Sequence, residues 1–399
     1  MTPKDLSMKF EEIYGKGTEK LRFFAAPGRV NLIGEHIDYC GGLVFPAALT
    51  LGNIVAIRPN GTNTLRFAAT DLPGIYEANL EDIDRAKALK WGNYQAGVAK
   101  ELMLLGCKLV GADLLFDSTL PYGSGLSSSA AIELSTGVAL YALSANKDEI
   151  ALDNVQLSLA GQRAESHFCG VNCGIMDQYA SGMGKKDHAI LLDCGKVSHQ
   201  YVPLKLGAYR LVLANTCKKH SLGASKYNER RGEVEKGLAM LHEADPSNKK
   251  EHLCDYTEAD FDRLKACFKN EPIIQNRVQH VIFENARVKK AAEVLSKGDL
   301  MAFGQILKEA NDSIRDLYEV TGDELDAMIE AAKNAPGCIG SRMTGAGFGG
   351  CTVNIVETAQ IDAFIQTVGD VYTKKTGLTP QFYVCSIGDG AREITEEVL

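Results

Sequence analysis

The feature of this chain that most limits its fold is the stretch PYGSGLSSSAAIE, residues 121–133, where glycines and serines stand directly before an apolar segment with the pattern of a helix start. Gly123 and Gly125 free the backbone from the limits that a β-carbon imposes on φ. The serines at positions 127–129 place hydroxyls at the expected helix N-terminus. Such a loop can bind an anion, because its backbone N–H groups and the helix dipole both favour negative charge. An ordinary capped turn explains the same residues, so this stretch alone leaves both interpretations open.

The surrounding pattern mixes strands and helices. Helical patterns are expected over 91–106 and 130–145, and short β-branched or aromatic runs indicate strands at 21–27, 51–59, 64–70, 111–119, 188–194, 199–204 and 208–216. The serine-rich loop therefore falls between a strand and a helix. After residue 216 the chain is helical and charged up to about residue 334, with an amphipathic run at 280–298. Strands return at 350–356 and 380–387.

A proline and a glycine in VPLKLGAY, residues 202–209, suggest a domain boundary. We therefore expect an α+β protein with one domain over residues 1–205 and a second over 206–399, each with helices and strands. A length of 399 residues suits two or three domains.

The amino-acid composition excludes some classes of binding partner. The net charge of −8 argues against nucleic acid or an acidic membrane surface as a partner, because both need clustered basic side chains. The 11 cysteines are odd in number and scattered, and no signal peptide precedes them, so we expect reduced thiols and a cytoplasmic protein. Cys169 and Cys173 lack a second cysteine pair or histidine cluster at zinc spacing. No apolar run has the roughly 18–20 residues of a membrane span.

A second glycine-bearing stretch, APGRVNLIGEHIDYCGG at 26–42, follows an expected strand. It holds Arg29, Glu35, His36 and Asp38 within ten residues. Polar groups of both signs suit a hydroxyl-rich small molecule, because each sugar hydroxyl both donates and accepts hydrogen bonds. A surface loop with ordinary charges is the alternative.

The third stretch, TGAGFGGC at 344–351, matches G-x-G-x-x-G. A dinucleotide site would need a helix after it, whereas CTVNIV has the pattern of a strand, so the motif does not favour that function. Between the second and third stretches, Glu165 stands in a helical pattern and Asp177 follows CGIM. Each could equally be a solvated carboxylate.

Several phosphate-binding motifs are absent from the sequence. There is no G-x-x-x-x-G-K-[ST] and there are no protein-kinase HRD and DFG elements, so neither standard phosphoryl-transfer template applies.

Taken together, these stretches resemble a known family. GRVNLIGEHIDY resembles the galactokinase signature, PYGSGLSSSA the phosphate loop of the wider GHMP kinase superfamily, and GAGFGGCTV the third motif of that superfamily. The likeness extends to WGNY at 91–94, ESHFCGVNCGIMDQ at 165–178, KHSLGASKYNERR at 219–231 and SIRDLYEVT at 313–321. GEHIDY and CGIMDQ are the discriminating pieces, because they are similar to galactokinases and their N-acetylgalactosamine kinase relatives in particular. Tyr122 and Ser124 depart from the residues common in the phosphate loop.

The resemblance implies a two-domain GHMP kinase fold with a ribosomal-protein-S5-like N-terminal domain, a ferredoxin-like C-terminal domain with extra helices, and an active site at their interface. It implies that ATP phosphorylates galactose at the C1 hydroxyl with Mg²⁺ as cofactor. Asp177 would be the catalytic carboxylate, with Arg29 beside it. The residues implied to bind the sugar are Glu35, His36, Ile37, Asp38, Gly174, Asp177 and Tyr227. Those implied to bind ATP are Gly123, Ser124, Gly125, Leu126, Ser127, Ser128 and Ser129, with Trp91 near the adenine. Ser129 and Glu165 would hold the metal.

Two other functions remain open. The chain could phosphorylate a related sugar such as N-acetylgalactosamine or arabinose, or it could be a sugar sensor that binds both ligands without turnover. Against a sensor stand Ser129, Ala130, Asp177 and Arg29, which a sensor need not keep. The partners expected are the small molecules alone, and the protein is expected to be a monomer or a weak dimer.

Overall fold

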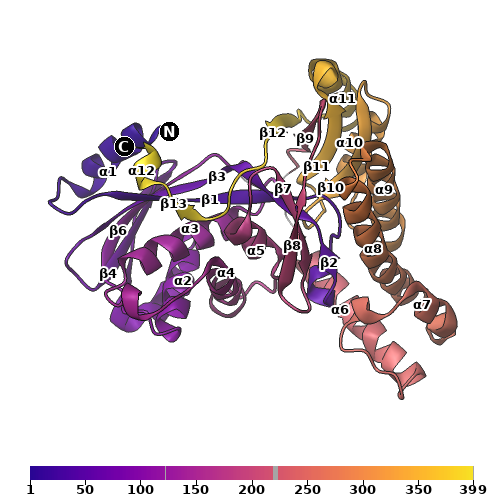
Figure 1. Ribbon diagram of the computed structural model, residues 1–399, viewed down its shortest axis with the longest axis horizontal. Helices are drawn as coiled ribbons and strands as arrows, with labels where there is room; N and C mark the ends of the chain where they lie inside the picture. The colour runs from indigo at the N-terminus through magenta and orange to yellow at the C-terminus, as the bar shows by residue number, and fades with distance from the viewer. Residues whose placement is uncertain (122, 219–222, 399) are drawn as a thin grey trace.

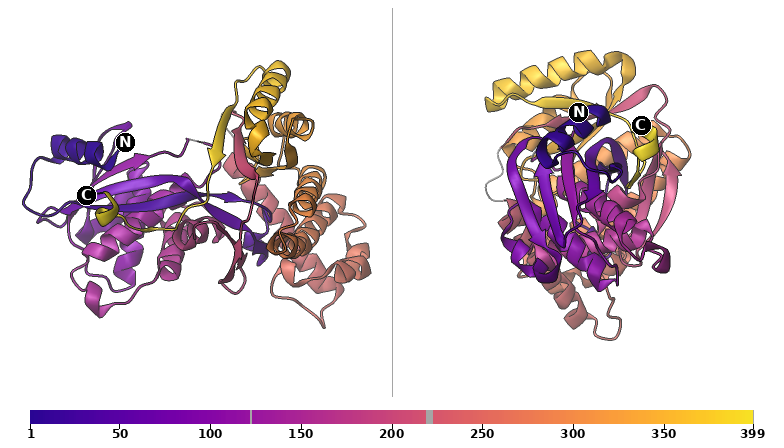
Figure 2. Two further views of the ribbon diagram at one scale, coloured as in Figure 1. Left: turned by 45° about the horizontal axis from the view of Figure 1, so that its top comes forward. Right: turned by 90° about the vertical axis from the view of Figure 1, so that its left-hand side faces the viewer.

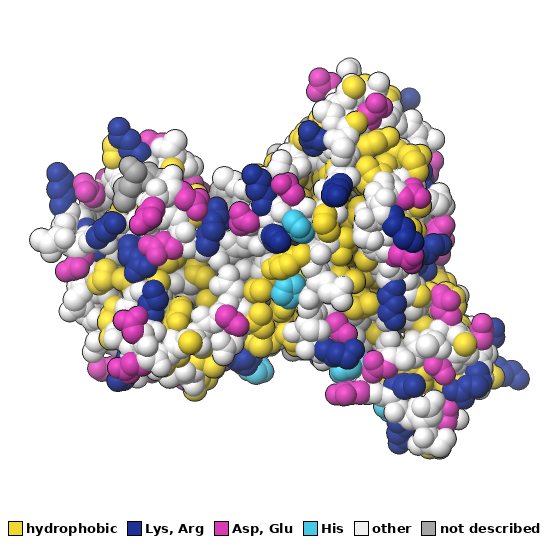
Figure 3. Space-filling view, in the orientation of Figure 1, with side chains coloured by type: hydrophobic (Ala, Val, Ile, Leu, Met, Phe, Trp, Pro, Cys, Tyr) yellow, Lys and Arg dark blue, Asp and Glu magenta, His cyan; other side chains and the backbone are white. Residues whose placement is uncertain are grey.

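The computed structural model describes residues 1–121, 123–218 and 223–398. Tyr122 of the serine-rich loop and residues 219–222, which begin the stretch KHSLGASKYNERR, lie outside this part. Figure 1 shows two lobes, with a large sheet and its helices on one side and a mainly helical lobe with a smaller sheet on the other. Figure 3 shows charged side chains of both signs interspersed over one face of the molecule.

The secondary structure follows the expected mixture. The helices are α1 (Pro3–Tyr14), α2 (Gly92–Leu104), α3 (Ser128–Leu143), α4 (Asn154–Arg163), α5 (Met176–Met183), α6 (Gly223–Ala244), α7 (Glu258–Leu264), α8 (Pro272–Ser296), α9 (Leu300–Ser313), α10 (Asp323–Lys333), α11 (Ile361–Thr376) and α12 (Thr395–Val398). The strands are β1 (Arg22–Asn31), β2 (Leu43–Val44), β3 (Pro46–Pro59), β4 (Thr64–Ala69), β5 (Leu72–Asn79), β6 (Ala112–Ser118), β7 (His188–Asp193), β8 (Ser198–Pro203), β9 (Tyr209–Asn215), β10 (Cys338–Thr344), β11 (Cys351–Glu357), β12 (Gln381–Cys385) and β13 (Arg392–Glu393).

The first sheet has six strands in the order β13-β1-β3-β6-β4-β5. Most neighbours are antiparallel, as in the Phe24↔Val55 register of β1 and β3, whereas β4 runs parallel to β6. Helices α2 to α5 lie along one side of the sheet in Figure 1, and α1 lies along the other. Leu6 and Phe10 of α1 pack there with Phe23 and Leu115 of the sheet.

The second sheet has four antiparallel strands in the order β10-β11-β9-β12. Its side chains alternate between two cores, as the period of two in a strand requires. Leu211 and Leu213 of β9 belong to the largest hydrophobic core, whereas Val212 packs with Met328 of α10 and Phe364 of α11. A third, three-stranded sheet runs β2-β7-β8.

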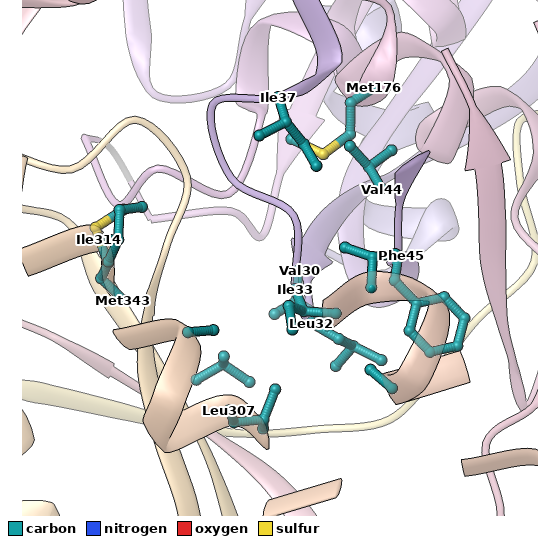
Figure 4. Packing of buried hydrophobic residues seen from close by; sticks show 14 of the residues in the cluster. Val30, Leu32, Ile33, Ile37, Val44, Phe45, Met176, Leu307, Ile314 and Met343 are labelled. Carbon is teal, nitrogen blue, oxygen red and sulfur yellow. The ribbon is translucent and has the colours of Figure 1, made fainter. Parts of the chain in front are cut away.

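The largest core joins the two lobes. It contains Val30 of β1 and the following Leu32 together with Leu307 of α9 and Met343 of β10. Figure 4 shows these side chains together with Phe45. The second glycine-bearing stretch therefore packs against both lobes, because β1 ends inside this core.

The end of the chain returns to the first sheet. Strand β13 pairs with β1, with Phe24 opposite Glu393, and Arg22 forms an ion pair of 2.6 Å with Glu393. Figures 1 and 2 show both chain ends beside this sheet. The boundary between residues 205 and 206 falls between β8 and β9 and stays a prediction, since the last residues pack against the first lobe.

Several sequence expectations can be compared directly with the structure. The serine-rich loop lies between β6 and α3, as predicted, and the third glycine-bearing stretch turns from β10 into β11, so it is a strand and not a helix that follows it. Strands β5 and β10 were not expected, because Pro73 and Gly74 in the first and Gly340 and Arg342 in the second interrupt the apolar pattern. None of the helices in the described part of the chain combines the length and the apolar character needed to cross a bilayer.

Candidate active site

The three glycine-bearing stretches meet at the serine-rich loop. A β-carbon on Gly28 would lie 2.6 Å from the carbonyl oxygen of Leu126, one on Gly345 2.8 Å from that of Gly125, and one on Gly350 3.1 Å from that of Ser124. Contacts this short between backbones exclude larger residues at Gly28 and Gly345. Segments from residues 26–42, 121–133 and 344–351 are thus packed backbone against backbone.

The loop itself has the left-handed turns that its glycines permit. Gly123 has φ +66° and Gly125 has φ +72°. Ser127 also has a positive φ, +59°, which is uncommon for a residue with a β-carbon. Ser127 stands at the N-cap of α3 but makes no side-chain hydrogen bond to the helix. The ordinary capped turn therefore does not form at Ser127, and its hydroxyl leaves the first N–H groups of α3 to other acceptors.

Arg29 and Asp177 form an ion pair directly under this loop. Arg29 Nε donates to Asp177 Oδ1 at 2.9 Å, and Nη1 donates to the carbonyl of Gly125 at 2.7 Å. Ser127 Oγ donates to the other carboxylate oxygen, Oδ2, at 2.6 Å. The Arg29 side chain is 4% exposed and that of Asp177 32% exposed, so the carboxylate is open to a ligand while the arginine is enclosed.

A small pocket opens beside this pair. Both lobes line it. The lining residues are Arg29, Glu35, His36, Asp38, Cys173, Gly174, Met176, Asp177, Tyr227, Gly345 and Ala346. The structure therefore brings together every sequence-predicted catalytic and sugar-binding residue except Ile37, and adds Cys173, Met176, Gly345 and Ala346, to which the sequence analysis gave no catalytic or sugar-binding role.

Asp38 and Gly174, which both line this pocket, are in direct contact. A β-carbon on Gly174 would lie 1.8 Å from Asp38 Oδ2, so a larger residue there would have to displace the Asp38 carboxylate. Burial, then the nearby charge of Asp177, raises the pKa of Asp38 to about 6. The site therefore holds two carboxylates close together, an arrangement that favours ligands with hydroxyl donors or a positive charge.

Glu35 is tied to the second lobe. Its Oε2 accepts a hydrogen bond from Arg342 Nη1, and its Oε1 accepts one from the backbone N–H of Gly345 at 3.1 Å. Burial raises the pKa of Glu35, while the Arg342 charge opposes this rise. Arg342 also lies 3.8 Å from the buried Glu284 of α8. Glu35 thus holds the two lobes together besides lining the pocket.

His36 is a neutral ring whose two nitrogens are both engaged. Nε2 lies 3.0 Å from the carbonyl oxygen of Ala346, which can only accept, so Nε2 carries the proton. Nδ1 therefore accepts from the Tyr39 hydroxyl at 2.9 Å, and Tyr39 in turn accepts from Tyr318 at 2.8 Å. Burial lowers the pKa of His36 to about 4, which agrees with the neutral form. The His36 ring lies 5.3 Å from that of Tyr227, so the two form one wall.

The predicted metal ligands also lie together. Glu165, in a π-helical turn over Ala164–Phe168, interacts with the Ser129 hydroxyl. Burial and the charge of Asp177 raise the pKa of Glu165 to about 7. Nε2 of Gln178 donates to Glu165 at 2.6 Å and to the buried Glu133 at 2.9 Å. A hydroxyl and a carboxylate in an acidic, partly closed site are hard oxygen ligands that suit Mg²⁺.

Besides the residues predicted to bind phosphate and metal, Ile37 and Trp91 do not line the pocket. The side chain of Ile37 is buried in the largest core, and Figure 4 shows it near Met176 and Val44. Trp91 directly precedes α2 and its ring packs edge-on against Tyr76 and Phe116. The indole Nε1 of Trp91 is buried without a hydrogen-bond partner.

The sequence analysis did not identify the buried residues that lie next to the pocket without lining it. Arg342, Glu284 and Tyr318 are all buried. Arg342 donates to Glu35, the Tyr318 ring packs against that of His36, and Glu284 lies beside Arg342. The one signal available for Arg342 was a charged residue just before the third glycine-bearing stretch. Tyr318 lies in the stretch SIRDLYEVT that carries part of the resemblance, which gave it no role. For Glu284 the sequence offers no signal, because charged helical residues usually face solvent.

Family models match along most of the chain. The galactokinase galactose-binding signature matches residues 8–59, the GHMP kinases N terminal domain residues 93–185, and the GHMP kinases C terminal residues 291–374. These matches confirm the predicted two-domain GHMP kinase fold of mixed α and β structure.

Curated relatives and solved structures agree with the family models. The chain is 47% identical to galactokinase of Clostridium tetani, over 99% of this chain and 98% of that one, and 44% identical to galactokinase of Bacillus subtilis, over 99% and 100%. The crystal structure of Lactococcus lactis galactokinase complexed with galactose has a TM-score of 0.92 at 37% identity, covering 98% of this chain and 99% of that one. Methanococcus jannaschii mevalonate kinase, 18% identical with a TM-score of 0.63 over 94% and 100%, shares the fold. Because the likeness to galactokinases runs from end to end and includes the segment that carries Arg29, Glu35, His36 and Asp38, this chain belongs to the galactokinase family.

Proposed function

We infer that this chain is a galactokinase, which transfers the terminal phosphoryl group of ATP to the C1 hydroxyl of α-D-galactose and releases galactose 1-phosphate and ADP. One observation carries this inference beyond the family match. The Arg29–Asp177 pair joins the serine-rich loop to a pocket lined by the sugar signature, so an anion on the loop and a sugar in the pocket would meet at one carboxylate.

We propose that galactose binds in the pocket through Asp38, Tyr227, Glu35 and the backbone around Gly174. Carboxylate oxygens accept hydrogen bonds from sugar hydroxyls, and a site built for such bonds rejects an epimer that leaves buried groups unpaired. Both ring nitrogens of His36 are engaged within the protein, so this residue would contact the sugar through its ring surface. Ile37 would contribute through its backbone, since its side chain is in the core.

The serine-rich loop would bind the phosphates of ATP. Its backbone N–H groups from Gly123 to Ser129, with the N-terminus of α3, supply donors and a favourable dipole without a dedicated lysine. Trp91 would lie near the adenine, as the family resemblance implies.

We propose that Ser129 and Glu165 hold Mg²⁺. The bound ion would neutralise phosphate charge. Burial and the nearby charge of Asp177 raise the pKa of Glu165 to about 7, and a bound cation would favour the ionised carboxylate, which supports this assignment.

In the reaction, Asp177 would accept the proton of the C1 hydroxyl as this oxygen attacks phosphorus. General-base assistance of this kind contributes about 10²- to 10⁴-fold. The guanidinium of Arg29 holds the carboxylate in place by its bond to Oδ1. Its second bond, to the loop carbonyl of Gly125, fixes the carboxylate relative to the phosphates, and such positioning is a large part of phosphoryl-transfer catalysis.

A product assay tests the proposed function. Purified protein with ATP and Mg²⁺ is given galactose, N-acetylgalactosamine or arabinose, and both ADP and sugar phosphate are measured. We expect galactose 1-phosphate with the highest kcat/KM. Preference for another sugar would identify a related kinase, and binding of galactose and ATP without ADP formation would identify a sensor.

We also propose that the protein is cytoplasmic and a monomer or weak dimer. All eleven cysteines are free thiols, which supports a reducing compartment. Light scattering on a sizing column over a range of protein concentrations measures the oligomeric state.

A further inference from the structure

The serine at the end of the phosphate loop has a conformation and a partner that phosphate binding does not explain. Ser127 has φ +59°, in the left-handed region, and its hydroxyl turns away from helix α3 to donate to Asp177 Oδ2 at 2.6 Å. A residue with a β-carbon adopts this conformation at an energetic cost, which tends to be found where the geometry serves a site.

We propose that Ser127 is a positioning residue, whose hydroxyl fixes the orientation of the Asp177 carboxylate and ties it to the phosphate loop. This inference rests on the proposed function, because it concerns the same transfer reaction. It assigns to Ser127 a side-chain role that the phosphate-loop resemblance does not contain.

Further hydrogen bonds around Ser127 fix the phosphate loop relative to the Asp177 carboxylate. The backbone N–H of Arg29 donates to the carbonyl of Leu126 at 3.2 Å, and the Arg29 side chain donates to the carbonyl of Gly125 at 2.7 Å. The two residues before Ser127 are therefore held by the same arginine that binds Asp177. The loop backbone and the carboxylate form one hydrogen-bonded unit, closed on one side by Arg29 and on the other by Ser127.

Both oxygens of the Asp177 carboxylate accept hydrogen bonds that fix its orientation. Oδ1 accepts from Arg29 and Oδ2 accepts from Ser127, so rotation of the carboxylate about its last side-chain bond would break both interactions. Each carboxylate oxygen has two lone pairs. Acceptor positions thus remain for the sugar hydroxyl, and the two donors determine where these positions point.

A role as phosphate ligand makes a different kinetic prediction. If the Ser127 hydroxyl bound ATP, its loss would raise the KM for ATP. If it positions Asp177, its loss lowers kcat and leaves the KM for ATP unchanged, since the backbone N–H groups of the loop are retained. Steady-state kinetics separates the two roles.

The variants are Ser127→Ala and Ser127→Gly. Both lose the hydroxyl, and glycine also accepts the positive φ, so it keeps the loop conformation even if alanine disturbs it. A hydrogen bond to a charged group corresponds to about 10- to 100-fold in rate, so we expect kcat to fall by this factor in both, with the KM for ATP within about twofold of wild type. Ser144→Ala, at the other end of α3, controls for loss of a serine hydroxyl that bonds only within its own helix end.

A second measurement uses Asp177 itself. If Ser127 acts through Asp177, adding Ser127→Gly to Asp177→Ala causes no further loss of residual turnover, because the carboxylate to be oriented is gone. Either of two results would overturn the proposal. One is that Ser127→Gly lowers turnover by the same factor in the wild-type protein and in Asp177→Ala. The other is that it raises the KM for ATP about tenfold and leaves kcat unchanged. Galactose turnover by the wild-type protein tests the proposed function separately, whereas the ratio of variant to wild-type kcat tests Ser127.

Discussion

Arg29 bonds both to the carboxylate of Asp177 and to the backbone of the serine-rich loop, with distances of 2.9 Å to Oδ1 and 2.7 Å to the carbonyl oxygen of Gly125. The two partners lie in segments 52 residues apart along the chain, at positions 125 and 177. One enclosed guanidinium thus links the loop proposed to bind phosphate to the carboxylate proposed to accept a proton.

This double contact predicts that lysine cannot replace arginine. A single ammonium group lacks the planar fork needed to reach the carboxylate and the carbonyl together. We expect Arg29→Lys to lower kcat by about 10- to 100-fold, because one of two charged hydrogen bonds is lost. Steady-state assays of galactose 1-phosphate formation measure this. A lysine variant with wild-type kcat would show that the geometry of the fork is unimportant.

We expect Asp38 to contribute to galactose binding and to lower the free energy of unfolding near neutral pH. Its folded pKa of about 6 lies above the value near 4 in an unfolded chain, so its contribution to folding is complete below pH 4 and is lost as the pH rises through 6. Asp38→Asn should therefore raise the free energy of unfolding at pH 8, by at most about 3 kcal/mol and by less where water screens the charge.

The same substitution should weaken galactose binding, because the amide presents only one acceptor atom. Denaturant unfolding at pH 8 and calorimetric titration with galactose measure the two effects. Asp370→Asn, at an exposed position on α11, is the matched control. Unchanged galactose affinity in Asp38→Asn would remove Asp38 from the sugar site.

Gly174 provides a steric test of the same contact. A β-carbon there would lie 1.8 Å from Asp38 Oδ2, so Gly174→Ala must displace that carboxylate. We expect the KM for galactose to rise at least about tenfold, with ATP binding unchanged, as the sugar site loses one charged hydrogen bond. Gly232→Ala on α6, where nothing lies within 4 Å, should leave both unchanged. Equal kinetics in the two variants would mean that Asp38 and Gly174 do not shape the sugar site.

Buried neutral histidines should make the protein acid-sensitive. Burial lowers the pKa of His280 to about 3, below the unfolded value near 6.5, so the unfolded chain binds more protons between these values. Its contribution is present above pH 6.5 and is lost as the pH falls. At pH 5 the loss amounts to about 2 kcal/mol. His280→Asn should reduce the stability difference between pH 7 and pH 5 by this amount, as measured by denaturant unfolding. An identical difference in variant and wild type would contradict the buried neutral state.

Local patterns predicted the parts of the site that depend on neighbours in sequence. The strand–loop–helix order around Gly123 to Ser129 followed from glycine, serine and apolar spacing. The polar cluster from Arg29 to Asp38 was evident for the same reason. Their convergence with residues 344–351 was implied by the family resemblance and not by any of the three stretches alone.

Local sequence patterns could not predict polar contacts between residues that are far apart along the chain. Arg342 and Glu35 are 307 residues apart, and nothing near either residue indicates the other. The run at 280–298, which makes up most of α8, was expected to be amphipathic, yet its polar residues His280 and Glu284 are buried. Glu284 pairs with Arg287 of the same helix, but it also accepts a hydrogen bond from Gly34, and His280 contacts Ser313 of α9. Burial of these groups therefore depends on tertiary packing and not on helical period alone.

The central claim is that Asp177 stands where the sugar hydroxyl is deprotonated, and its most direct test is the Asp177→Asn variant. Quantitative phosphorus NMR of galactose 1-phosphate formation, together with calorimetric titration of ATP, should show turnover reduced by about 10²-fold or more and an unchanged affinity for ATP. Turnover within about threefold of wild type would contradict the account, because a catalytic carboxylate cannot be replaced by an amide at so small a loss.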